Sequence, residues 1–136
     1  MTFIMTDNIN VEKIYRFWIG SSDADYNTMI HLFESKDYHW ALFIGHIVLE
    51  KLLKASVVKT LHDHAPFTHD LAKLASFSKL NFSEEQLDWL DTITTFNLNA
   101  RYDSYKQAFY QKCTPEFTMY WIDIIKRLRL WIKDKQ

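Results

Sequence analysis

Apolar side chains recur every three and four residues along most of the chain, the spacing that places them on one face of an α-helix. The clearest stretch covers residues 37–60, where the apolar stripe runs from Tyr38 to Leu53. Gly45 lies inside this stripe, although a glycine there costs about 1 kcal/mol of helix propensity. We therefore predict a helix over 37–60 that another helix approaches closely at Gly45.

Similar patterns predict further helices on both sides of this stretch. Residues 11–35 have a helical period, with an irregularity expected at "GSSDAD", where Ser21 or Ser22 would cap a second segment. Thr68 is expected to cap a short helix through "DLAKLASF". Ser83 and Gln86 match a capping box and predict the start of the next helix.

The last part of the chain also follows the helical period. The stretch "SYKQAFYQKC" is expected to be helical. Thr114, Pro115 and Glu116 then form a strong start signal, with a capping residue, a proline at the first helical position and an acidic residue in the first turn. A final helix is therefore predicted from there to the C-terminus.

The composition favours long helices over many short strands. The 136 residues include 48% hydrophobic residues but only two glycines and two prolines, which leaves little turn chemistry. We find no convincing strand and no internal repeat. The predicted fold is an all-α, up-and-down bundle of four to five helices, formed by one domain over residues 1–136.

Several protein classes are disfavoured by the sequence. The single cysteine, Cys113, excludes an internal disulfide, and the N-terminus lacks the basic start and apolar run of a signal peptide. No stretch approaches the roughly 20 apolar residues of a membrane helix. We expect a cytoplasmic protein with no membrane association.

The net charge of −1 is unevenly distributed. Residues 1–100 hold eight basic and thirteen acidic side chains, a balance of −5, whereas residues 101–136 hold eight and four, a balance of +4. The basic last quarter could meet an anion such as a nucleic acid. The solvated surface of long helices, which carries lysines in any case, is the favoured interpretation.

A polar group lies on the predicted helix 37–60. His46, Glu50 and Lys54 are spaced by four residues and share one helix face. One interpretation is a solvated face with weak ion pairs. Phe43 and Ile47 flank it, however, and favour a face covered by a second subunit or by the basic segment.

Three histidines surround the loop "HDHAPFTHD". His62, His64 and His69 suggest zinc, but their spacing matches no common zinc module and no cysteine is near. Alternatively, His62 and His64 end one helix and His69 begins another. We expect no metal, and no cofactor either, because the chain has no phosphate-binding glycine loop, G-x-S-x-G or H-E-x-x-H motif.

The stretch "FNLNARYDSYK", residues 96–106, carries several groups that could bind a ligand. Arg101 has donors suited to phosphate or carboxylate, and Asn97 and Asn99 can bond a backbone or a ligand. Tyr102 could stack on a ligand, and Lys106 could add a second positive charge. We interpret this stretch as an anion-binding loop; the alternative is a corner in which Arg101 only joins two helix ends.

Three blocks in order, "DYHWALFIGHIVLEKLLKA", "PFTHDLAKLA" and "FNLNARYDSYKQAFYQKC", resemble a HEPN-domain protein of the small prokaryotic type. The resemblance covers nearly the whole chain. It implies a helical bundle, a homodimer with a shared cleft, and a toxin–antitoxin-like pairing with a minimal nucleotidyltransferase. Some relatives bind nucleotides and others are ribonucleases.

The ribonuclease branch that the chain resembles carries an arginine followed, after four to six residues, by a histidine. Arg101 matches the arginine, but the corresponding positions hold Lys106, Gln107 and Ala108. A normal lysine is a poor base for RNA cleavage. We therefore expect binding of a nucleotide or RNA without a catalytic residue. An RNA-cleaving toxin that uses a substitute base, such as His46, remains the alternative.

Overall fold

The computed structural model describes residues 9–136, which contain six helices and no strand. The helices are α1 (Val11–Glu34), α2 (Tyr38–Leu61), α3 (Leu71–Ser78), α4 (Glu84–Arg101), α5 (Asp103–Lys112) and α6 (Pro115–Asp134). The predicted all-α bundle is confirmed, with more helices than the four or five expected. None of these six helices is long and apolar enough to cross a membrane.

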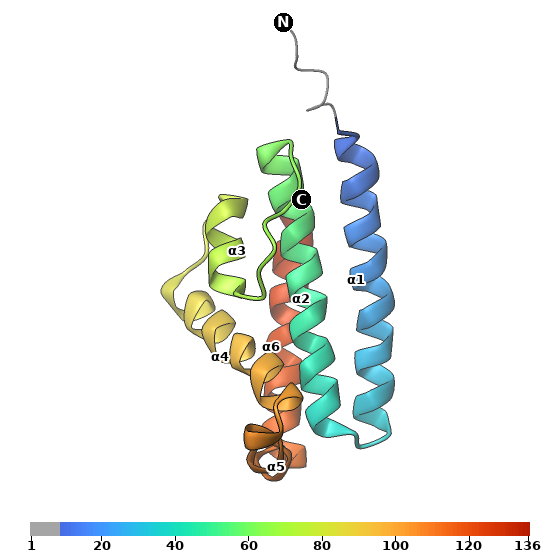
Figure 1. The fold of residues 1–136 in the computed structure, drawn as a ribbon, viewed down its shortest axis with the longest axis vertical. Helices are drawn as coiled ribbons and strands as arrows, with labels where there is room; N and C mark the ends of the chain where they lie inside the picture. The colour runs from blue at the N-terminus through green and yellow to red at the C-terminus, as the bar shows by residue number, and fades with distance from the viewer. Residues whose placement is uncertain (1–8) are drawn as a thin grey trace, which may run out of the picture.

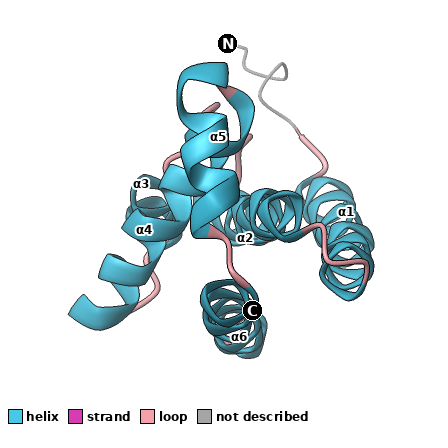
Figure 2. Ribbon diagram, turned by 90° about the horizontal axis from the view of Figure 1, so that it is seen from below, coloured by secondary structure: helices cyan, strands magenta, loops and turns pink. Residues whose placement is uncertain are grey.

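The long helices α1, α2 and α6 form the body of the bundle. Helix α1 runs antiparallel beside α2, while α3 and α4 lie on the opposite side of α2 and α5 covers the lower end (Figure 1). Seen from below, α2 lies between α1 and the α3–α4 pair, with α6 on a third side (Figure 2). Helix α2 is therefore the centre of the fold.

The central position of α2 explains its sequence. Most of its residues from Ala41 to Val58 are buried, because α1, α3, α4 and α6 all contact it. At Gly45, an added Cβ would lie 2.6 Å from Cδ1 of Ile125 on α6 and 3.1 Å from Sδ of Met29 on α1. The close approach predicted at this glycine is confirmed, and two helices make it.

Helix α1 is continuous, so the irregularity predicted at residues 20–25 is wrong. Ser22 lies fully buried in the middle of the helix. Its hydroxyl donates a 2.7 Å hydrogen bond to the backbone carbonyl of Val48 on α2. The serine therefore joins two helices instead of starting one, because a buried hydroxyl must find an acceptor.

Most of the predicted helix starts are confirmed. Ser83 and Gln86 form the full capping box of α4, and the hydroxyl of Thr114 accepts a 3.1 Å hydrogen bond from the backbone of α6. The start of α3 differs from the prediction. Asp70 caps this helix, and the Thr68 hydroxyl instead accepts a 3.1 Å bond from the amide of Asp70.

The stretch 96–106 is not a loop, and that part of the prediction is wrong. Helix α4 continues to Arg101, only Tyr102 has extended backbone angles, and α5 starts at Asp103. A second short junction at Cys113 connects α5 to α6. Cys113 is buried, and this burial raises the pKa of its thiol to about 12.

Candidate functional site

His46 lies at the centre of a hydrogen-bonded group that joins α2, α4 and the segment before α3. Its side chain has no exposed surface. Nε2 lies 2.8 Å from the backbone oxygen of His69 and must donate to it, so Nδ1 is the acceptor for the Asn97 side-chain amide at 3.4 Å. Burial lowers the pKa of His46, although the bond to His69 and the nearby Glu50 carboxylate oppose this shift.

Asn97 connects His46 to Arg101. The Asn97 side chain is buried on α4, and its Oδ1 accepts a 2.8 Å hydrogen bond from Nε of Arg101, one turn later. The guanidinium group lies 5.2 Å from the ring of Tyr102. Arg101 is an exposed residue, and its two terminal nitrogens make no hydrogen bond within residues 9–136. These nitrogens are therefore available to a ligand.

Glu50 joins Lys54 and His69 to the same group. Its carboxylate accepts a 3.0 Å bond from Nζ of Lys54 and a 2.8 Å bond from Nδ1 of His69. Glu50 and Lys54 are only 7% and 6% exposed. The interpretation of a solvated face is therefore wrong.

This face is covered from within the chain. The Lys54 ammonium lies 5.3 Å from the ring centre of Trp18 on α1 and 5.8 Å from that of Phe67 in the segment before α3. The sequence had suggested a second subunit or the basic segment as the cover. We call the six residues that join in this arrangement the polar network: Arg101, Asn97, His46, His69, Glu50 and Lys54.

The other predicted binding residues lie apart from the polar network. Asn99 is two residues beyond Asn97 on the same helix, so it points elsewhere and lines a separate hollow of about 220 Å³ with Tyr105. The Lys106 amino group lies 4.8 Å from the ring centre of Trp40 at the start of α2. The expectation that both asparagines fix a loop is wrong, because both lie within α4.

The three histidines considered for zinc do not converge. Within residues 9–136, no group of three or more His, Cys, Asp or Glu side chains is arranged to hold a metal ion. His62 ends α2 with a left-handed backbone (φ 56°), in line with the helix-end interpretation. The bond between the His69 ring and Glu50 is the role that the sequence analysis missed. Its partner Glu50 is 19 residues away, and only the position of "PFTHDL" against α2 brings them together.

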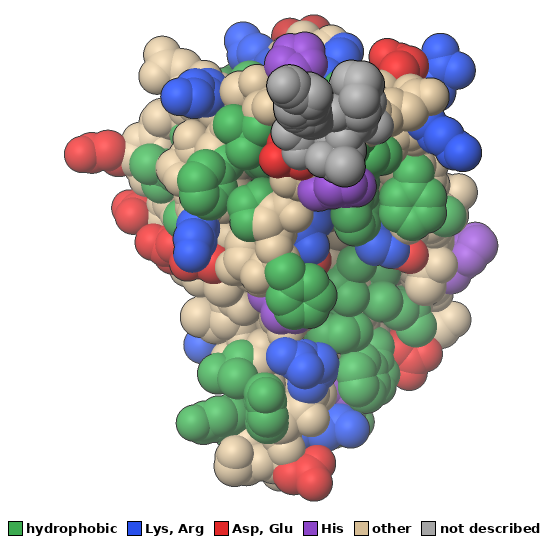
Figure 3. All heavy atoms as spheres, turned by 45° about the horizontal axis from the view of Figure 1, so that its top comes forward, with side chains coloured by type: hydrophobic (Ala, Val, Ile, Leu, Met, Phe, Trp, Pro, Cys, Tyr) green, Lys and Arg blue, Asp and Glu red, His purple; other side chains and the backbone are tan. Residues whose placement is uncertain are grey.

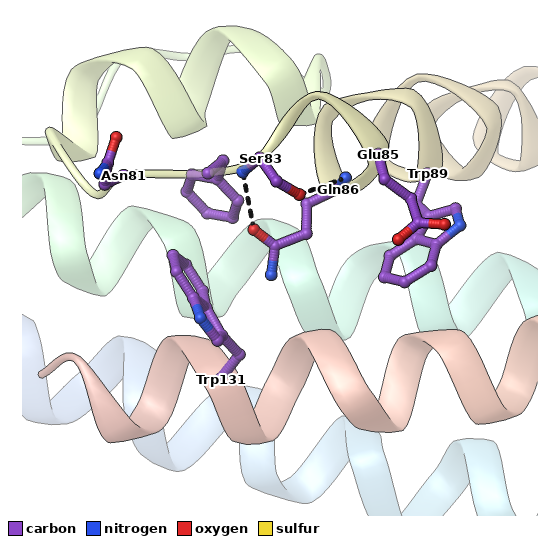
Figure 4. A pocket seen from close by; sticks show the side chains of 7 residues that line it. Asn81, Ser83, Glu85, Gln86, Trp89 and Trp131 are labelled. Carbon is purple, nitrogen blue, oxygen red and sulfur yellow. Dashed lines mark hydrogen bonds between the residues drawn. The ribbon is translucent and has the colours of Figure 1, made fainter.

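One face of the molecule mixes charged and apolar side chains. In Figure 3, histidine and basic side chains lie among hydrophobic ones on one face of the molecule. A larger hollow, of about 520 Å³, opens elsewhere, between Trp89 and Trp131 at the start of α4 (Figure 4). None of the predicted site residues lines this hollow. Its Gln86 side chain is already bonded to the backbone of Ser83.

The comparison of the sequence with known families identifies the class of protein. Residues 15–135 match the HEPN domain, and the chain therefore belongs to the HEPN family. The fold is similar to the crystal structure of TT1696 from Thermus thermophilus, with a TM-score of 0.75, 15% identity, and coverage of 90% of this chain and 98% of that one. At this identity the likeness shows the fold alone. No curated protein matches the sequence significantly.

Proposed function

We propose that this HEPN protein is a dimeric binding module that holds the phosphate of a nucleotide or RNA at Arg101. We further propose that it forms a toxin–antitoxin-like pair with a minimal nucleotidyltransferase. The observation that carries the binding proposal is the state of Arg101: Asn97 fixes its Nε, while the end of the guanidinium is exposed and without a partner in residues 9–136.

A fixed guanidinium is well suited to phosphate. Arginine presents donors in a planar fork that matches two phosphate oxygens, and anchoring its inner nitrogen reduces the entropy lost on binding. Tyr102, 5.2 Å away and half-exposed, offers a ring beside that phosphate. Lys106, in the first turns of α5, would add a second positive charge for a longer ligand.

His46 is a poor candidate for the substitute base of a ribonuclease. Its side chain is fully buried, and both ring nitrogens already have partners in His69 and Asn97. A general base must reach the proton that it removes. The polar network therefore supports His46 as a structural connector that positions Asn97, and through it Arg101.

A homodimer is supported by apolar side chains that are not fully covered within residues 9–136. Phe43 and Ile47 are only partly buried on α2, and Phe17 on α1 is 62% exposed. We propose that a second copy of this single HEPN domain covers them. Size-exclusion chromatography with light scattering should give a mass near twice 16.3 kDa. A monomer at tens of micromolar would contradict the dimer.

The binding proposal is tested by comparing Arg101→Ala with Arg16→Ala. Arg16 is an exposed arginine whose partner among residues 9–136 is Glu12 on α1, so it controls for the loss of one charge. A charge-assisted contact contributes roughly 1.5–3 kcal/mol, so Arg101→Ala should weaken binding of labelled single-stranded RNA or ATP about ten- to a hundredfold. Arg16→Ala should leave the affinity unchanged.

Two further readouts separate binding from a structural role. The affinity of the parent protein should fall as salt rises, because phosphate contacts release counterions. Arg101→Ala should lower the melting temperature by no more than the loss of its one hydrogen bond to Asn97 explains. Absence of any nucleotide or RNA binding by the parent protein, together with a large drop in the melting temperature of Arg101→Ala, would instead show a structural corner.

The proposed partner has its own test. Co-expression with a minimal nucleotidyltransferase encoded beside this chain should yield a complex that copurifies through two affinity steps. If no such enzyme is encoded nearby, or if the two proteins do not copurify, the pairing proposal fails while the binding proposal stands.

A further inference from the structure

The hollow at the start of α4 has the walls of a small-molecule site. Its volume of about 520 Å³ lies within the range of about 300–1,000 Å³ that such sites occupy. Phe82 and Trp131 form one wall, with ring centres 4.7 Å apart, and Trp89 lies on the other side of the Gln86 side chain (Figure 4). Three aromatic rings around one hollow favour a flat, unsaturated ligand.

Gln86 places a fixed hydrogen-bond donor in this hollow. Its Oε1 accepts a 2.9 Å hydrogen bond from the backbone amide of Ser83, and this bond determines which end of the side-chain amide is oxygen. The Nε2 group therefore points away from that amide and into the hollow (Figure 4). It makes no hydrogen bond within residues 9–136. The capping box thus holds a side chain with two unused N–H groups in a set position.

Glu85 supplies acceptors to the same hollow. Its side chain is exposed and lies next to Trp89 (Figure 4). Within residues 9–136, no basic side chain forms an ion pair with it. A carboxylate accepts through two oxygens and donates nothing. A ligand that bonds both polar side chains must therefore present an acceptor to Gln86 and N–H or O–H donors to Glu85.

The charges around the hollow favour a neutral ligand. Cζ of Arg127 lies 5.5 Å from the ring centre of Trp89, and Nζ of Lys135 lies 5.3 Å from that of Trp131. These two cations already lie at the tryptophans and would repel a cationic ligand. The Glu85 carboxylate would repel an anionic ligand. The hollow therefore suits neither the organic cations that bind to aromatic cages nor a free phosphate.

We propose that this hollow binds the base of a guanine nucleoside. Guanine is flat and uncharged, and one edge carries an acceptor oxygen next to two N–H donors. The oxygen matches the Gln86 amide, and the two donors match the two oxygens of the Glu85 carboxylate. Paired, parallel N–H bonds to one carboxylate add geometric specificity. Adenine has a single amino group on the corresponding edge and bonds only one carboxylate oxygen.

This site is separate from the proposed phosphate site. Gln86 and Arg101 are 15 residues apart on α4, which corresponds to about 22 Å along the helix at about 1.5 Å per residue. Guanosine has no phosphate, so it isolates the hollow from Arg101. The proposal therefore does not depend on the proposed function.

The test is isothermal titration calorimetry of the full-length protein with guanosine. Glu85→Gln should weaken binding about ten- to a hundredfold, because charge-assisted hydrogen bonds to the base are lost. Glu84→Gln is the matched control, because Glu84 is the other acidic residue in the first turn of α4 and does not line the hollow. This control should bind guanosine like the parent. Adenosine should bind the parent about tenfold more weakly than guanosine.

Gln86→Glu provides a second test that preserves the start of α4. Glutamate completes a capping box as glutamine does, so the melting temperature should change little. The substitution replaces the donor by an acceptor, so guanosine binding should be lost. In NMR spectra of the parent, guanosine should shift the indole N–H signals of Trp89 and Trp131, which Trp89→Phe and Trp131→Phe identify.

Four results would each overturn the proposal. They are no binding of guanosine by the parent at millimolar concentration, equal affinities for guanosine and adenosine, an unchanged affinity in Glu85→Gln, and loss of guanosine binding in Arg101→Ala. The last result would place the ligand at the other end of α4. None of the first three bears on the binding proposed at Arg101.

Discussion

Glu50 and Lys54 form a buried ion pair whose strength can be measured through a double-mutant cycle. Their charged atoms lie 3.0 Å apart, and the two residues are 7% and 6% exposed. Replacing Glu50 alone by Met would leave the Lys54 ammonium buried, with the rings of Trp18 and Phe67 as its remaining partners among residues 9–136. Removing one partner of a buried pair costs about 3–5 kcal/mol. The two rings place the expected loss near the lower end, about 3 kcal/mol.

The double variant Glu50→Met/Lys54→Met should be more stable than Glu50→Met. It leaves no buried charge, and the half-exposed His69 can bond water in place of the carboxylate. Replacing a whole buried pair by apolar residues of similar volume is often neutral or stabilising. The coupling between the two substitutions should therefore be about 1–3 kcal/mol, within the range seen for residues in contact.

Urea unfolding of the four proteins, followed by circular dichroism, gives these free energies. The pair Glu12 and Arg16 provides the control, because it has the same spacing of four residues on a helix but side chains that are 56% and 78% exposed. Its coupling should be only about 0.3–0.5 kcal/mol. If the losses of Glu50→Met and Lys54→Met simply add in the double variant, the reasoning about this buried pair is refuted.

Two further predictions concern packing and pH. Gly45→Ala should be destabilising by about 0–2 kcal/mol in urea unfolding, because overpacking against Ile125 costs about 1–3 kcal/mol and the better helix propensity of alanine offsets about 1 kcal/mol. Gly20→Ala, with open space around it, should be stabilising by up to about 1 kcal/mol. Equal effects of the two substitutions would refute the close contact at Gly45. Burial lowers the pKa of His46 below its ordinary 6.5, so below this pH the unfolded chain binds more protons than the folded protein. The contribution of His46 to stability is therefore complete above pH 6.5 and is lost as the pH falls towards the lowered pKa of the folded state. His46→Gln should flatten this decrease in melts between pH 8 and 5. A decrease of unchanged slope in His46→Gln would contradict the assignment.

Local sequence signals predicted much of the fold. The apolar stripe of α2, the capping box at Ser83 and the threonine–proline start at Thr114 all depend on residues within one or two turns of each other. Gly45 could be interpreted from its position alone, because a glycine that interrupts an apolar helical stripe favours close contact with a neighbouring helix. These features do not depend on which other segments pack against them.

The errors arose where a distant partner determines the structure. Ser22 suggested a helix start, yet its hydroxyl bonds the backbone of Val48 on α2. His69 was expected at the start of a helix, with a metal site weighed and rejected, although its ring bonds a carboxylate 19 residues earlier. Residues 96–106 suggested a loop because they lack an apolar period. In fact α4 is helical to Arg101, and its polar Asn97 faces inward to bond His46.

The single buried thiol makes the chain a natural subject for labelling kinetics. Cys113 is 6% exposed at the junction of α5 and α6, and burial raises its pKa to about 12, so few molecules carry the reactive thiolate at neutral pH. A thiol reagent can therefore react readily only after this junction opens. The rate of this labelling reaction reports how often α5 separates from the bundle. A comparison of the rate with and without RNA would show whether a ligand bound at the end of α4 makes this separation of α5 less frequent.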